Sequence, residues 1–179
     1  MLIQNLEKKE TKKSFNYSEI AFLDCEWLLK GDLLFVGVYT TNSGWKKFLP
    51  SDSNSLNKFI KNYSLVVVYG NDAGVIKKNM DVDLKKNFNC LNYIRIINKY
   101  TRFKTKRIYD LENKLGLKRE VKLYKHSIQR LFDDWKRPER REAIYKYNRE
   151  DCKNLYHIFK IIQSQIKLSF QDYLKECMK

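Results

Sequence analysis

The sequence predicts an α/β fold: a mixed five-stranded sheet, with its first three strands antiparallel, flanked by helices. Two patterns lead to this expectation. Short apolar runs separated by turn residues fill the first half, and apolar residues three and four apart fill most of the second half. The chain has only 2 proline and 6 glycine residues among 179, and neither a repeat nor a low-complexity linker divides it. We therefore expect a single domain at residues 19–179, after a flexible basic segment at residues 1–18.

Three strands open the predicted sheet. Residues 20–28 are apolar on both faces apart from two acids, which is typical of a buried strand. A turn at residues 30–32 leads to a second strand at 33–40, and a turn at 42–44 leads to a third at 45–49. Because these connections are short, the three strands should form an antiparallel meander.

The later elements alternate between helices and strands and then become helical. Residues 52–62 have the apolar spacing of an amphipathic helix, and the apolar run LVVVY at 65–69 is expected at the centre of the sheet. A helix from about residue 74 to residue 79 and a last strand at 88–91 should follow. Helical periodicity then covers residues 93–100, 108–115, 127–135, 139–166 and 170–178.

The composition favours a nucleic-acid partner and argues against a membrane protein. The net charge is +15, from 36 basic and 21 acidic residues, and residues 95–149 carry most of the excess. A basic face attracts a phosphate backbone, although a lysine-rich surface that only maintains solubility would give the same charge. No apolar run approaches the roughly 18 residues that a membrane span requires. The four cysteines form no CxxC pair, so we expect reduced cysteines and a cytoplasmic location.

Three carboxylates lie at strand positions that suit a metal site. Asp24 and Glu26 are two residues apart in the first strand, so both side chains should point to the same face. Asp72 follows the central strand, and ligands gather at the carboxyl ends of such strands. Buried carboxylates that repel one another need a cation to remain ionised together. The alternatives are a solvated strand end for the first two, and a helix N-cap for Asp72, with Asn71 as the nearby substitute.

A tyrosine and a fourth carboxylate lie on one face of the long helix predicted at 139–166. Tyr147 and Asp151 are four residues apart, so Asp151 could bind metal while the Tyr147 hydroxyl stands beside it. The same spacing also suits an exposed aspartate beside a core tyrosine. The run WKRPERR suits a turn between two helices, but its four basic residues are also candidate phosphate contacts: Lys136, Arg137, Arg140 and Arg141.

The order of these motifs resembles a known nuclease family. D-x-E in the first strand, Asp after the central strand and Y-x-x-x-D on a late helix are similar to the DEDD exonucleases of the ribonuclease H-like fold, in their tyrosine subclass. Lys146 stands where the histidine subclass has His. Within this group the chain resembles the YprB-type family of predicted exonucleases: residues 109–119 are similar to its L-x-x-x-E-x-x-L-G-x-x-R stretch and YNREDCKNL to its Y-N-x-x-D-x-x-x-L stretch. The second motif departs, because YGNDAGVI replaces N-G-x-x-F-D.

The resemblance implies metal-dependent hydrolysis of phosphodiester bonds from a 3′ end. The implied partner is nucleic acid, either DNA or RNA, with a single-stranded 3′ end. Two Mg²⁺ or Mn²⁺ ions would be held by hard oxygen ligands, and Tyr147 would orient the attacking water. The implied catalytic residues are Asp24, Glu26, Asp72, Asp151 and Tyr147. Two alternatives stay open: a non-catalytic nucleic-acid-binding module on a degenerate nuclease fold, and a structure-specific endonuclease.

Overall fold

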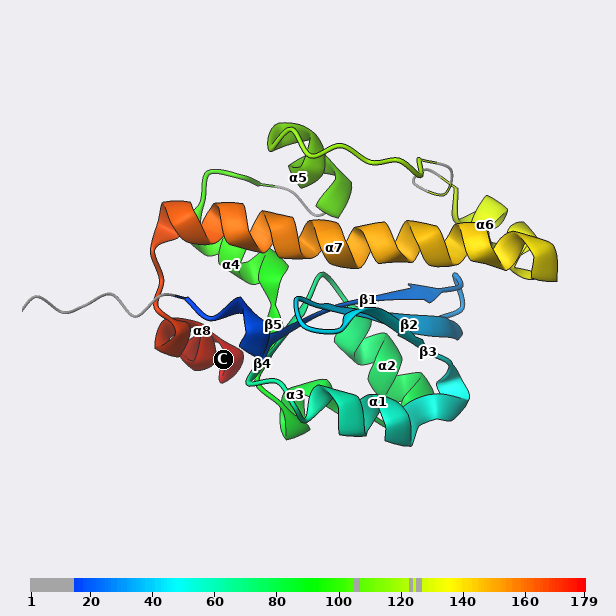
Figure 1. Cartoon of the computed structure of the whole chain (residues 1–179), viewed down its shortest axis with the longest axis horizontal. Coiled ribbons are helices and arrows are strands. Elements are labelled where there is room, and N and C mark those ends of the chain that lie inside the picture. Colours follow the sequence, from blue (N-terminus) through cyan, green and yellow to red (C-terminus); the bar gives the residue numbers. More distant parts are fainter. Residues whose placement is uncertain (1–14, 105–106, 123, 125–126) are drawn as a thin grey trace, which may run out of the picture.

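The computed structural model describes residues 15–104, 107–122, 124 and 127–179 (Figure 1). Most of the segment predicted to be flexible, residues 1–18, lies outside the described residues. The described chain begins its regular structure with a 3₁₀ turn at Tyr17–Glu19 and enters the first strand at once.

The sheet has five strands in the spatial order β3-β2-β1-β4-β5, which confirms the predicted mixed sheet. β1 pairs antiparallel with β2, and β2 with β3, whereas β1, β4 and β5 run parallel. The last strand is short and starts later than predicted, because Phe88 packs against the core from outside the strand. The strands are β1 (Ile20–Trp27), β2 (Leu33–Thr40), β3 (Gly44–Phe48), β4 (Leu65–Val68) and β5 (Cys90–Asn92).

Helices cover both faces of the sheet. α7 (Arg141–Ile166) runs along one face, while α1 (Ser53–Ile60), α2 (Asp72–Met80) and the unpredicted α3 (Leu84–Asn87) lie on the other (Figure 1). The long helix begins two residues later than expected, because Pro138 starts a 3₁₀ turn in front of it. The remaining helices are α4 (Tyr93–Tyr100), α5 (Ile108–Lys114), α6 (Ile128–Trp135) and α8 (Phe170–Cys177).

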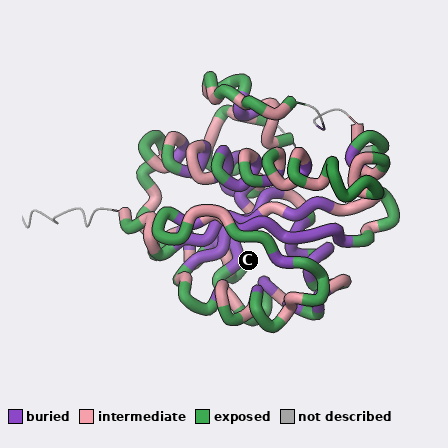
Figure 2. The backbone as a smooth tube through the Cα atoms, turned by 45° about the vertical axis from the view of Figure 1, so that its right-hand side comes forward, coloured by how far each residue is buried: buried purple, intermediate pink, exposed green. Residues whose placement is uncertain are grey.

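Alternation along β1 divides the core into two layers. Leu23 and Cys25 pack toward α1 and α2, whereas Ile20 and Phe22 pack toward α7. β1, β2, β4 and β5 are accordingly mostly buried, whereas the edge strand β3 and the outer faces of the helices are more exposed (Figure 2). The same alternation turns Asp24 and Glu26 toward α7, which brings them opposite Asp151.

Within the described residues, none of the helices combines the length and apolar character that crossing a membrane would demand. All four cysteines are free thiols, and three of them are buried: Cys25, Cys90 and Cys152.

Candidate metal centre

Three carboxylates from two elements meet beneath α7. Asp24 and Glu26 come from the end of β1, and Asp151 comes from the middle of α7. One oxygen from each of the three lies within 4.8 Å of the others. Glu26 is 8% exposed and Asp151 4%, while Asp24 is half-buried. Three acids at this separation, largely out of water, repel one another strongly.

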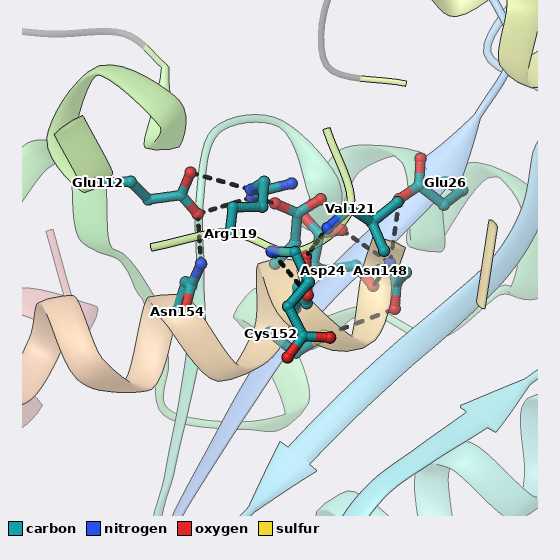
Figure 3. Close-up of polar contacts among 11 residues, drawn as sticks. Asp24, Glu26, Glu112, Arg119, Val121, Asn148, Cys152 and Asn154 are labelled. Atoms are coloured by element: carbon teal, nitrogen blue, oxygen red, sulfur yellow. Dashed lines mark hydrogen bonds and ion pairs between the residues drawn. The ribbon is translucent and has the colours of Figure 1, made fainter. Parts of the chain in front are cut away.

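A buried amide holds the two acids of β1. Nδ2 of Asn148 donates to Oδ2 of Asp24 at 2.8 Å and to Oε1 of Glu26 at 3.4 Å (Figure 3). The other end of the amide, Oδ1, accepts from Nε1 of Trp45 at 3.2 Å. No ion pair to Asp24 or Glu26 is formed within the described part of the chain. The group that hydrogen-bonds to these two carboxylates is therefore the neutral amide of Asn148.

Asp151, in contrast, meets a buried cation. The Arg119 guanidinium pairs with Asp151 and with Glu112, whose Oε1 lies 2.6 Å from Nη2 (Figure 3). Asn154 donates to the same Oε1 of Glu112 at 2.8 Å. Arg119 side-chain atoms are only 4% exposed. The loop after α5 is therefore fixed to α7 through an arginine that reaches the carboxylate cluster.

Asp72 lies near this cluster but outside the three acids that meet. It occupies the first position of α2, and Asn71, which is exposed, takes the N-cap position without a side-chain capping bond. Oδ1 of Asp72 accepts from the Cys25 thiol at 3.3 Å. Its Oδ2 is buried with no hydrogen-bond partner among the described residues. The capping alternative for Asp72 is therefore wrong, and one of its oxygens remains available to a ligand.

Burial raises the pKa of all four acids. It raises the pKa of Asp24 well above its usual range, and the charges of Asp151, Asp72 and Glu26 add to this effect. Burial and then the Asp151 charge raise the pKa of Glu26 to about 8. Burial raises the pKa of Asp72 to about 7, against the hydrogen bond from Cys25. Burial raises the pKa of Asp151 to only about 6, because the Arg119 guanidinium opposes the effect of burial.

The hydroxyl of Tyr147 should stay protonated. Burial, followed by the charges of Asp151 and Glu26, raises the pKa of Tyr147 above its usual value. Its ring lies under the Arg119 guanidinium at 4.8 Å and meets the Tyr124 ring edge-on at 5.7 Å. A tyrosine held in this way can donate a hydrogen bond to a water or phosphate oxygen but is a poor base.

The four basic candidates differ in how free they are. Lys136, Arg137 and Arg140 are exposed at the turn between α6 and α7, and the Lys136 ammonium lies over the Phe132 ring at 3.8 Å. Arg141 instead donates from Nε to the backbone oxygen of Trp135 at 2.9 Å and lies over its ring. Ten residues of helix separate Arg141 from Asp151, or about 15 Å. The turn therefore lies beside the cluster, not within it.

The residues of the site that had no role in the sequence interpretation include Gly37, Glu112, Arg119 and Asn148. The last three fall within the stretches similar to the YprB-type family, so that resemblance was a signal for them. Gly37 carried no signal, because its importance comes from the space above it.

Comparison with protein families gives one match. Residues 21–163 match the family model described as the RNase_H superfamily, and this span covers well over half of the chain. A search of curated proteins finds no match.

Proposed function

We propose that this chain, which belongs to the RNase H superfamily, is a metal-dependent nuclease that acts as a 3′–5′ exonuclease. The superfamily indicates a nuclease that acts on nucleic acid. One observation carries the proposal: Asp24, Glu26 and Asp151 are gathered within 4.8 Å, largely buried. A purely structural role would give no reason to bring three like charges together out of water.

The donor set fits a hard divalent cation. All candidate ligand atoms are carboxylate oxygens, which suit Mg²⁺ or Mn²⁺ better than softer metals. Asp24, Glu26 and Asp151 would hold the metal, and the unpartnered Oδ2 of Asp72 supplies a further oxygen nearby. When bound, two such ions would lower the pKa of a water and stabilise charge on the leaving oxygen.

The chain's own side chains would orient the substrate and the attacking water. Tyr147, in its protonated state, would donate to that water or to a phosphate oxygen beside Asp151. The exposed Lys136, Arg137 and Arg140 would contact the nucleic-acid strand at the start of α7, about 15 Å along this helix from the carboxylate cluster. Arg141 is less available to a phosphate, since its Nε already donates a hydrogen bond to the backbone oxygen of Trp135.

The exonuclease assignment, in the tyrosine subclass of the DEDD group, is supported by the order of the motifs. Asp24 and Glu26 come first, Asp72 follows β4, and Tyr147 precedes Asp151 by four residues. We propose a single-stranded 3′ end of DNA or RNA as the substrate and, from the cysteine pattern, the cytoplasm as the location.

The test is cleavage of end-labelled single-stranded and duplex DNA and RNA in Mn²⁺, Mg²⁺ or EDTA, beside Asp24→Ala. We expect a metal-dependent ladder that is shortened from the 3′ end and absent in Asp24→Ala. Asp133→Ala, which removes an exposed carboxylate on α6, is the matched control and should cleave normally. Full activity of Asp24→Ala would refute the metal site, and cleavage of a circular strand would replace exonuclease by endonuclease.

One observation favours the alternative of a non-catalytic binding module. Asp72 accepts a hydrogen bond from Cys25 and stands apart from the other three acids, in the motif that departs from the family pattern. Binding of nucleic acid without cleavage of any substrate, in either metal, would support that alternative.

A further inference from the structure

A single buried amide connects α7 with both acids of β1. Asn148 is 0% exposed and lies over β2, at the position where Gly37 has no side chain. In the sheet register Gly37 is the direct partner of Asp24. A Cβ atom at Gly37 would stand 1.8 Å from Oδ1 of Asn148 and 2.6 Å from Nε1 of Trp45. The sheet therefore leaves a space that this amide and indole fill.

The orientation of the amide is determined by its surroundings. The indole N–H of Trp45 can only donate, so the Asn148 atom that faces it at 3.2 Å must be the oxygen. The Cys152 thiol, one turn along α7, approaches the same oxygen at 3.6 Å. The amide nitrogen consequently faces β1, where both of its hydrogens have carboxylate acceptors.

This contact leaves the two acids ready for a cation. Asn148 hydrogen-bonds to one carboxylate oxygen of Asp24 and one of Glu26, and the second carboxylate oxygen of each acid makes no hydrogen bond to this amide. As a neutral donor it orients both groups without cancelling their charge. An arginine or lysine at this position would neutralise them, as Arg119 does for Asp151, and would weaken attraction for a metal.

We propose that Asn148, oriented by Trp45, is a positioning residue that fixes Asp24 and Glu26 in the geometry that receives the divalent ion. This inference rests on the proposed function, because it concerns the same metal centre. Partners of metal ligands typically change metal affinity or activity about 10-fold to 100-fold when they are removed. Gly37 supports the same arrangement, since any side chain at this position would displace the Asn148 amide.

The test is Mn²⁺ binding to the full chain, measured by titration calorimetry, with thermal unfolding in EDTA measured in parallel. Asn148→Ala should bind Mn²⁺ about 10-fold to 100-fold more weakly. Trp45→Phe keeps an aromatic ring but removes the N–H, and should weaken binding less. In the Asn148→Ala background, Trp45→Phe should have no further effect on Mn²⁺ affinity, because its effect passes through the amide.

Tyr39→Phe is the matched control. Tyr39 pairs with Trp45 across the sheet but does not hydrogen-bond to Asn148 or the three acids, so the Mn²⁺ affinity of the Tyr39→Phe variant should equal that of the wild type. If Asn148→Ala does not fold, the Mn²⁺ affinity of Trp45→Phe decides the test. A purely structural role would lower the unfolding temperature in EDTA and leave Mn²⁺ affinity intact.

The outcomes separate this inference from the proposed function. Wild-type affinity in both Asn148→Ala and Trp45→Phe, with binding lost in Asp24→Ala, would overturn the positioning role and keep the metal centre. No Mn²⁺ binding by the wild type would overturn both. Weakened binding in both variants, with non-additive effects, would establish the Trp45–Asn148 pair as the support of the site.

Discussion

The acids of β1 and the acid of α7 meet in one cluster but receive different partners. Asp151 is paired with the buried Arg119, which is itself held by Glu112. Asp24 and Glu26 are contacted by the neutral amide of Asn148. The pKa values follow this difference: about 6 for Asp151 and about 8 for Glu26.

The difference shows where the protein supplies positive charge and where it does not. Arg119 compensates the α7 side of the cluster from within the chain. On the β1 side the excess of negative charge has to be relieved by protons or by a bound cation. A metal ion should therefore bind most strongly against Asp24 and Glu26, with Asp151 as the ligand that is already compensated.

The largest expected effect comes from removing the buried cation. Arg119→Ala leaves Glu112 and Asp151 buried without their partner, which should cost about 3–5 kcal/mol of unfolding free energy. Urea denaturation in EDTA measures it. Lys146→Ala, which breaks the exposed ion pair with Glu120, is the control and should cost about 1 kcal/mol at most. Equal small losses in both variants would mean that Arg119 does not compensate the cluster.

A second prediction concerns pH. Glu26, Asp72 and Asp151 have pKa values of about 8, 7 and 6, all above their usual range, so the folded metal-free protein binds more protons than the unfolded chain. Between about pH 5 and pH 8 its stability should therefore fall as pH rises, by up to about 1.4 kcal/mol per pH unit for each group.

Saturating Mn²⁺ should reduce this slope, because the cation takes over the role of the protons. Denaturant unfolding between pH 5 and pH 8, with and without Mn²⁺, measures both effects. In Glu26→Gln the metal-free slope should be shallower than in the wild type. A stability that rises with pH in EDTA would contradict the assigned pKa directions.

A third prediction tests whether the Tyr147 hydroxyl contributes to the rate of cleavage or to substrate binding. Tyr147→Phe should slow turnover about 10-fold, the effect of one hydrogen bond of about 1.4 kcal/mol in the transition state, with substrate affinity nearly unchanged. Single-turnover cleavage and anisotropy binding separate the two. Tyr145→Phe, on the same helix but packed against Phe35, is the control. An unchanged rate in Tyr147→Phe would remove its proposed role.

The smallest effects are expected at the exposed cations. Lys136→Ala and Arg140→Ala should each weaken binding of nucleic acid a few-fold and reduce the salt slope by about 1, with stability unchanged. Arg141→Ala should instead lower stability, since it loses its contacts with Trp135. Anisotropy across a salt series measures the slope. If Arg141→Ala alters the slope and Arg140→Ala does not, the assignment of free and occupied cations is reversed.

The sequence by itself determined most of the elements, though not α3, and the element faces that the acids share. The apolar run LVVVY predicted the buried strand β4, although β1 and not β4 takes the central place in the sheet, and the two-residue spacing placed Asp24 and Glu26 on one face of β1. The four-residue spacing placed Asp151 on the same face of α7 as Tyr147, and the structure shows that this aspartate is buried. These are local properties, because the side-chain direction in a strand or helix follows from its backbone period.

Only the tertiary structure decided which groups the acids meet. Asn148 reaches Asp24 across 124 positions of sequence, and Arg119 reaches Asp151 across 32. Asp72 turns one oxygen to Cys25, although the sequence grouped it with the other acids. Such partners depend on how closely α7 approaches the sheet above Gly37, and on where the loop after α5 docks. The period of a single element contains no information on either distance, so these contacts follow from packing between elements.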